Sequence, residues 1–318
     1  MVVILVLWQQ WIKLLSSSRY ALAATGNSTA GYFGGGFSGV HKTIVDKLTY
    51  STDTTARVPG ADLSSARMDL GATGNSDAGY FGGGRGWPSQ STMDKLTYSN
   101  ETTAQVPGAS LSVARNRITA TGNSAGGYFA GGTPGPVSTV DKVTYSSDTT
   151  AAVPGAKLSQ AKYRVGSVSS RQNALPEVSL GTTSNTGYFT GGKAPSAVST
   201  VDKLTYASDT TAQVPGASLT QTRYDHAAIS SSSAAYSSGG YAPSPASTIA
   251  SSTEKTTYST DTTAVAPSAN LSGNNQRQTA TGNSTDGYFG GGDISGNDIS
   301  TVDKLTYSSE TIAAVPGA

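Results

Sequence analysis

The chain of 318 residues has no cysteine and only two histidines. Without cysteine it cannot form a disulfide scaffold, a thiol nucleophile or a zinc cluster built on thiolates. The two histidines, His41 and His226, are far apart in the sequence and lack the spacing that is typical of metal ligands. The sequence therefore predicts neither a metal site nor a cofactor.

Charge and long apolar runs are scarce as well. Only 13% of the residues are charged and the formal net charge is +1, so we expect no basic surface that would bind a nucleic-acid backbone. The apolar run at residues 2–8 is too short to cross a bilayer. We therefore expect no nucleic-acid partner and no integral membrane span.

Runs of helix-forming residues are also missing, because glycine, serine, threonine and tyrosine crowd the sequence. The chain instead repeats one phrase six times with small variations, Gly-Tyr-Phe-Gly-Gly-Gly followed by Val-Asp-Lys-Leu-Thr-Tyr. The tyrosine of the first element recurs at intervals of 48, 48, 60, 48 and 52 residues, at Tyr32, Tyr80, Tyr128, Tyr188, Tyr236 and Tyr288. A period of about 50 residues is close to that of kelch repeats and longer than the 33 or 34 residues of ankyrin and TPR helical repeats.

Each copy contains four short segments with strand character. In the first copy they are residues 19–24, 30–34, 43–50 and 54–58, which are rich in β-branched and aromatic residues and are separated by turns containing Gly, Asn, Asp or Pro. Four strands joined in order by tight turns predict one small antiparallel sheet per copy. Such a sheet cannot bury both faces alone, so the six sheets must stack on one another.

The glycine pair after an aromatic strand, the tyrosine-bearing strand that follows and the Leu-Ser-x-x-Arg that opens the next copy resemble the kelch repeat. The near-verbatim phrases are similar to those of kelch-like repeat proteins of marine phages and environmental microbes. The tryptophan that the kelch family carries in its fourth strand is absent, and Val58 or its equivalents stand there. The resemblance implies an all-β fold, a six-bladed β-propeller with four antiparallel strands per blade.

The repeat covers nearly the whole chain, so we expect one propeller domain at residues 15–318. The predicted blades are residues 15–62, 63–110, 111–157, 158–218, 219–270 and 271–318. No blade is shared between the two ends, so closure is expected to depend on blade packing, with residues 2–7 as a candidate extra strand. Residues 1–14 lie outside the repeats, and a signal peptide, a closing strand and a disordered start all fit them. A longer array of repeats, of which this chain is a piece, also fits.

Two charged features recur in the copies. Neighbours on a strand point to opposite faces, so the recurring Asp-Lys pair cannot act as one acid–base device. The pair is expected to be structural, with Asp bonded to a nearby turn and Lys in solvent. A cation after Leu-Ser is expected to brace one blade against the next. It is present as Arg19, Arg67, Arg115, Lys162 and Arg223, whereas the sixth copy has Asn275.

The copies differ most in the loop between the second and third strands, and these loops are expected on one face of the ring. Loops on a rigid scaffold are common binding sites. The aromatic and cationic candidates for ligand binding are Phe37, His41, Arg85, Trp87, Lys193 and Tyr241, with Trp87 the strongest for stacking on a sugar or anchoring a protein. Drift in unconstrained loops would give the same variation.

No catalytic residue is predicted, because the chain has no nucleophile elbow and no Cys for a Cys–Tyr copper centre. The sequence favours a non-enzymatic binding or adhesion module for a glycan or protein on a cell surface, extracellular or virion-associated. The alternatives are a carbohydrate-active enzyme with carboxylates in the central channel and a structural spacer. Acids outside the repeated positions show no pairing in the sequence: Asp69, Glu177, Asp225, Asp286, Asp293 and Asp298. The oligomeric state is left open.

Overall fold

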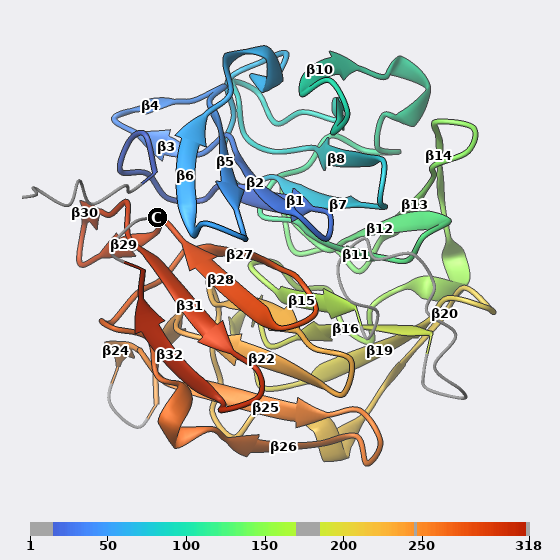
Figure 1. Ribbon diagram of the computed structural model, residues 1–318. Coiled ribbons are helices and arrows are strands. Elements are labelled where there is room, and N and C mark those ends of the chain that lie inside the picture. Colours follow the sequence, from blue (N-terminus) through green and yellow to red (C-terminus); the bar gives the residue numbers. More distant parts are fainter. Residues whose placement is uncertain (1–14, 170–184, 245–246, 316–318) are drawn as a thin grey trace, which may run out of the picture.

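The protein is a ring of six four-stranded antiparallel sheets around a central axis (Figure 1). The computed structural model describes residues 15–169, 185–244 and 247–315. The predicted closing strand at residues 2–7 and residues 170–184 of the long fourth copy lie outside the described residues. Within each sheet the strands pair in chain order. The first strands β1, β7, β11, β15, β21 and β27 contact one another in a closed circle. The predicted six-bladed, all-β propeller is confirmed.

The strands of blades 1 to 3 follow the repeat. Blade 1 contains β1 (Ala23–Gly26), β2 (Ala30–Gly34), β5 (Val45–Thr49) and β6 (Thr54–Arg57). Blade 2 contains β7 (Gly71–Gly74), β8 (Ala78–Gly82), β9 (Met93–Thr97) and β10 (Thr102–Gln105). Blade 3 contains β11 (Thr119–Gly122), β12 (Gly126–Ala130), β13 (Val140–Thr144) and β14 (Thr149–Ala152).

Blades 4 to 6 have the same plan. Blade 4 contains β15 (Gly166–Ser169), β16 (Thr186–Thr190), β19 (Val201–Thr205) and β20 (Thr210–Gln213). Blade 5 contains β21 (Ala227–Ser230), β22 (Ala234–Ser238), β25 (Thr253–Thr257) and β26 (Thr262–Val265). Blade 6 contains β27 (Thr279–Gly282), β28 (Asp286–Gly290), β31 (Val302–Thr306) and β32 (Thr311–Ala314).

Short elements decorate these sheets. In four blades the loop between the second and third strands forms a small hairpin: β3 (Phe37–Ser38) with β4 (Val40–His41), β17 (Lys193–Ala194) with β18 (Ser196–Ala197), β23 (Tyr241–Ala242) with β24 (Thr248–Ile249), and β29 (Asp293–Ile294) with β30 (Asn297–Asp298). One 3₁₀ turn follows the fourth strand in blades 1 to 5: η1 (Pro59–Ala61), η2 (Pro107–Ala109), η3 (Pro154–Ala156), η4 (Pro215–Ala217) and η5 (Pro267–Ala269).

The first strand of blade 1 begins later than the sequence predicts, at Ala23 instead of residue 19. Tyr20 forms an isolated bridge to Phe37, and Ala21 has a φ of 55°, a left-handed conformation that ends an extended run. The strand can form only after this kink. The second, third and fourth strands lie within the predicted segments.

The glycine that precedes each Tyr-Phe is required by packing between blades. A Cβ atom at Gly31 would lie 2.2 Å from Cγ2 of Thr281 on the neighbouring first strand, and one at Gly127 would lie 2.2 Å from Cγ2 of Thr73. Real Cβ atoms do not approach other atoms this closely, so the adjoining blades could not pack at this separation with a larger residue.

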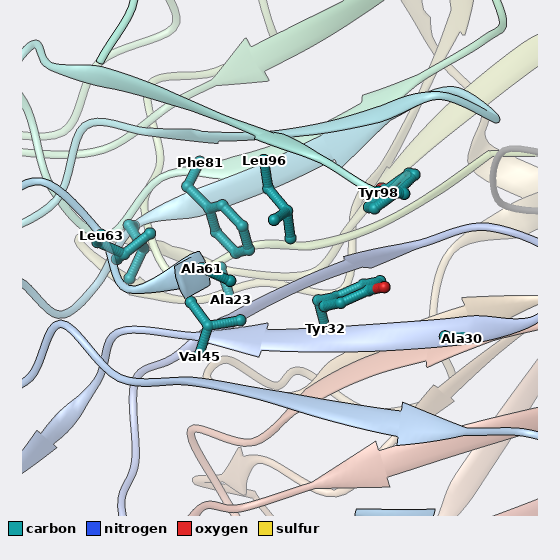
Figure 2. Packing of buried hydrophobic residues seen from close by; sticks show 10 residues of the cluster. Ala23, Ala30, Tyr32, Val45, Ala61, Leu63, Phe81, Leu96 and Tyr98 are labelled. Atoms are coloured by element: carbon teal, nitrogen blue, oxygen red, sulfur yellow. The ribbon is translucent and has the colours of Figure 1, made fainter. Parts of the chain in front are cut away.

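The two repeated tyrosines stack on each other across every blade interface. Tyr32 of β2 lies against Tyr98, which follows β9, with ring centroids 5.2 Å apart (Figure 2). The hydroxyl groups of Tyr98 and Thr25 are 2.9 Å apart, so the phenol is satisfied inside the interface. Equivalent stacks join the other blades, at centroid distances between 4.9 and 5.7 Å.

A polar contact accompanies each stack and corrects the expectation that the lysine of the Asp-Lys pair is only solvated. Lys95 of blade 2 donates to Asp148 of blade 3 at 2.8 Å, and Tyr80 donates to the same carboxylate at 2.5 Å. The same arrangement occurs at all six interfaces. The lysine and acid pairs are Lys47–Glu101, Lys95–Asp148, Lys142–Asp209, Lys203–Asp261, Lys255–Glu310 and Lys304–Asp53.

The segment at residues 15–19 closes the ring, a role the sequence did not reveal. Leu15 is buried against blade 6 and its N–H donates to the carbonyl of Ser300, while the N–H of Arg19 donates to Ile299. Residues 63–67 make the equivalent bonds to blade 1, where the N–H of Leu63 donates to Thr43. The first and last blades therefore lie side by side (Figure 1) and join as any other pair does.

Candidate functional site

The loops between second and third strands lie on one face of the ring, as predicted, and we call it the loop face. Each loop is fixed, through an isolated β-bridge, to the residue that follows the repeated cation or, in the sixth copy, Asn275. These bridges are Tyr20–Phe37, Met68–Arg85, Asn116–Thr133, Tyr163–Lys193, Tyr224–Tyr241 and Gln276–Asp293. The variable side chains are thus held around the axis by repeated main-chain contacts.

The next residue in each blade forms a closed hydrogen-bonded circle, the axial ring. Its members are Ala21, Asp69, Arg117, Arg164, Asp225 and Arg277. Each N–H donates to the carbonyl of the preceding member, and the last circle bond runs from Ala21 to Arg277 at 2.9 Å. All six have φ between 54° and 57°. The backbone conformation is the same in all six blades, whereas the side chain differs from blade to blade. The axial ring thus brings three arginines, two aspartates and one alanine to the channel mouth.

The axial charges are paired with one another. Asp225 accepts from Arg164 at 2.9 Å and lies 3.4 Å from Arg277, and Asp69 lies 3.7 Å from Arg117. Burial raises the pKa of both carboxyl groups, and the surrounding guanidinium groups oppose that rise. Asp69 and Asp225 therefore both belong to the axial ring, and each is paired with arginine.

Tyrosine rings pack around the guanidinium groups. Arg277 lies over Tyr20 at 5.2 Å from the ring centroid, and Arg164 lies over Tyr224 at 5.6 Å and Tyr163 at 5.9 Å. Cations over aromatic faces are attracted by the ring quadrupole. The axial arginines are therefore held in place by tyrosines as well as by aspartates.

Four of the six predicted binding residues come together over blades 1 and 2. The rings of Tyr20, Phe37, His41 and Trp87 form the aromatic row, with successive centroid distances of 5.6, 5.5 and 6.3 Å. Arg85 lies 4.4 Å from the ring of Trp87, whose surface is 79% exposed. Burial and, to a smaller extent, Arg85 lower the pKa of His41, which favours the neutral ring.

The other two predicted residues, Lys193 and Tyr241, belong to blades 4 and 5. Tyr241 lies 5.2 Å from Tyr224 between ring centroids, and the Lys193 ammonium lies 5.3 Å from the Tyr224 ring. Blades 4 and 5 are opposite blades 1 and 2 in a ring of six. The predicted residues thus share one face but form two groups on either side of the axial ring.

A pocket of about 480 Å³ lies between the loops of blades 1 and 6 and was not predicted as a site. It is lined by Tyr20, Phe37, Gly39, Arg277, Asp293, Gly296, Asn297 and Asp298. The rings of Tyr20 and Phe37 thus line the same pocket as the side-chain oxygens of Asp298 and Asn297. The signal in the sequence was the acidic loop of the sixth copy, which differs from all other loops.

The six first strands surround a central channel with a volume of about 170 Å³. It is lined largely by Gly, Ala, Ser and Thr of the six first strands, and none of the described lining residues is Asp or Glu. His226 reaches this layer and is buried, with its Nε2 2.9 Å from the Thr190 hydroxyl. The carboxylates expected in the channel by the enzyme hypothesis lie at its mouth instead.

Comparison with known proteins supports the fold and leaves the function open. No protein-family model matches the sequence, and no curated protein is significantly similar to it. Among solved structures, the chain is similar to the one titled "Structure of YjhT", with a TM-score of 0.75 and 10% sequence identity over 96% of this chain and 99% of that chain. At this identity the likeness establishes the propeller fold alone. Among the described residues, none lies in a helix long and apolar enough to cross a membrane.

Proposed function

We propose that the protein is a non-enzymatic binding module that holds a glycan on its loop face. The observation that carries this function is the aromatic row, which runs from the pocket at Tyr20 and Phe37 to the exposed ring of Trp87. The C–H faces of sugar rings stack on such aromatic rings, because apolar surface is removed from water and the ring face is electron-rich.

The pocket supplies the polar half of sugar recognition. Asp298 and Asn297 lie beside Phe37 and Tyr20, so acceptors for sugar hydroxyl groups stand next to aromatic faces. Concave sites with a few fixed polar groups are the usual places for small ligands. A chain of several sugars would fit this geometry, with one unit in the pocket and others on the row towards Trp87.

The proposal includes the location of the protein. The kelch-like phrases suggest a display protein, either extracellular or on a virus particle. A nearly neutral chain with a net charge of +1 supports a surface that does not attract nucleic acid. A protein on a cell surface is the other class of partner that an exposed tryptophan would suit.

A glycan array with the full chain tests this function. We expect selective binding, which Trp87→Ala weakens by about tenfold or more. Val265→Ala is the matched control, because Val265 is also exposed, at 52%, but lies on the outer strand β26. An array without signal would overturn glycan binding, and binding unaffected by Trp87→Ala would overturn the role of the aromatic row.

A carbohydrate-active enzyme is the second candidate, and the presence of two carboxyl groups, Asp69 and Asp225, in the axial ring supports it. Glycoside hydrolysis uses two carboxyl groups, of which one has a raised pKa. Here both carboxyl groups have raised pKa values but lie against arginines. Release of sugar from a bound glycan, lost in Asp225→Asn, would replace the binding proposal by this one.

A further inference from the structure

Five of the six blades contain a buried ion pair that the sixth lacks. In each of the five, the repeated cation binds the acid of the third strand in its own blade, and neither side chain is more than 2% exposed. The pairs are Arg19–Asp46, Arg67–Asp94, Arg115–Asp141, Lys162–Asp202 and Arg223–Glu254, at 2.7 to 2.9 Å.

Blade 1 shows what surrounds the cation. The Arg19 guanidinium donates to the Asp46 carboxylate at 2.7 Å, to the carbonyl of Phe33 at 3.1 Å and to the carbonyl of Gly35 at 2.9 Å. In blade 4 the ammonium group of Lys162 takes this place, 2.9 Å from Asp202. The site therefore accepts either a guanidinium or an ammonium group, held by one carboxylate and neighbouring oxygens.

Blade 6 keeps the oxygens of this site, but no side-chain cation among its described residues reaches them. Asn275 replaces the arginine, and its short side chain donates to the carbonyl of Gly291 at 2.9 Å, the equivalent of Gly35. Among the described residues, Asp303 accepts the N–H of Ser272 at 3.1 Å, and its Oδ1 has no hydrogen-bond partner. One carboxylate oxygen also lacks a partner in four of the other five blades, so blade 6 differs in the missing cation and not in this oxygen. Asp303 is 6% exposed, and among the described residues no Lys, Arg or His lies within ion-pair distance of it.

A buried carboxylate without a counter-charge is expensive, because the lost hydration is not replaced. The five other blades meet this cost with a side-chain cation. We propose that in blade 6 a small monovalent cation, ammonium or potassium, occupies the Asp303 site, defined by the carboxylate of Asp303 and the carbonyls of Phe289 and Gly291. The ammonium of Lys162 in the equivalent site of blade 4 gives the chemical precedent within the same chain.

The Asp303 site lies next to the loop that forms the pocket. Oδ1 of Asn275 accepts the N–H of Asp293 at 3.1 Å, and Gln276 donates to the Asp293 carboxylate at 2.7 Å. Asn275, which stands in place of the cation, is thus also the residue that fixes the blade 6 loop. Cation binding here does not depend on the glycan-binding proposal, because none of its ligands belongs to the aromatic row.

Thermal unfolding of the full chain in two salts tests the proposal. At equal ionic strength, we expect potassium chloride to raise the Tm, saturably and by about 2 °C or more, over tetramethylammonium chloride, whose cation is too large for the site. Asn275→Arg should raise the Tm in both salts and remove the difference between them. Asn270→Arg is the matched control, since it adds the same charge at an exposed position and should leave the potassium effect intact.

Asp303→Asn keeps the test decisive if the arginine variant does not fold, because it removes the carboxylate and should also remove the potassium effect. Equal Tm values for the unsubstituted chain in the two salts would overturn the proposal. A potassium effect that persists in Asn275→Arg or in Asp303→Asn would place the cation elsewhere and overturn it as well.

Discussion

The blade interfaces and the loop face are built on opposite principles. Each interface repeats the same tyrosine stack and the same lysine–acid contact around the ring. The loop face repeats only its backbone, through the axial ring and the β-bridges, while nearly every side chain differs. Side chains that recur therefore hold the ring together, and side chains that vary are free to specify a ligand.

The largest expected effect is on the repeated framework, at a buried ion pair. Arg67→Ala leaves Asp94 buried without its cation and should lower the free energy of unfolding by about 3–5 kcal/mol. Urea unfolding would measure it. Arg57→Ala, in a pair whose arginine side chain is 46% exposed, should cost less than about 1 kcal/mol. Equal losses in the two variants would contradict the framework role of the buried pair.

An intermediate loss of unfolding free energy is expected at low pH, because blade 5 carries a histidine at a position that is apolar in blades 1 and 2. His226 stands where blades 1 and 2 have Leu22 and Leu70, and burial lowers its pKa to about 3. In the unfolded chain the His226 imidazole binds a proton with the usual pKa of about 6.5, whereas in the folded chain it stays neutral down to a pH of about 3. Stability should therefore fall as the pH drops below that value, by about 1.4 kcal/mol per pH unit.

Denaturant unfolding at pH 6.5 and pH 5 would measure this slope. His226→Gln, which places the residue of blade 6 in blade 5, removes the titrating group and should flatten it. Position 278 already carries glutamine at the equivalent place beside the channel. An unchanged slope in the variant would assign the acid sensitivity to other groups.

A smaller effect is expected from one hydroxyl group. Tyr128→Phe removes the donor to Asp209 inside a blade interface and should cost about 1–2 kcal/mol of unfolding free energy. Tyr241→Phe removes a hydroxyl that contacts Ser247 on the loop face, at 2.6 Å in an exposed position, and should cost less than about 0.5 kcal/mol. The two variants make the same chemical change, so thermal unfolding compares the regions directly.

The smallest effect on stability is expected at the residue with the largest expected effect on binding. Trp87→Ala removes a ring that is 79% exposed, and the free energy of unfolding should stay within about 0.5 kcal/mol. Chemical denaturation of the binding-defective variant would check this. A large loss of stability would mean that Trp87 belongs to the framework, and the contrast between the two regions would fail.

Most of the fold could be predicted from the sequence because the repeated phrase carries both its strands and its interfaces. The second, third and fourth strands of blade 1 lie where β-branched and aromatic residues cluster. The first strand was misplaced because its apparent start, at Arg19 and Tyr20, serves the ion pair and the axial kink. Ring closure by residues 15–19 was missed since its bonds join the two ends of the chain.

The candidate site was predictable only in part. Loop variation located the face and its six candidate residues, but which loops meet depends on the order of blades and on side-chain reach. The pairing of Asp225 with Arg164 and Arg277 joins three different blades. A signal was available, because all axial residues stand two positions after the repeated cation or Asn275, yet no local pattern reveals that these six positions converge.

The stacked tyrosines give the molecule an optical reporter of its own integrity. Burial raises the pKa of Tyr50, Tyr98, Tyr145, Tyr258 and Tyr307, each of which lies inside a blade interface. In alkali these phenols stay protonated while the blades remain in contact and ionise once water reaches them. The ultraviolet absorbance of phenolate would then appear in one step as the circle opens, without any added dye or label.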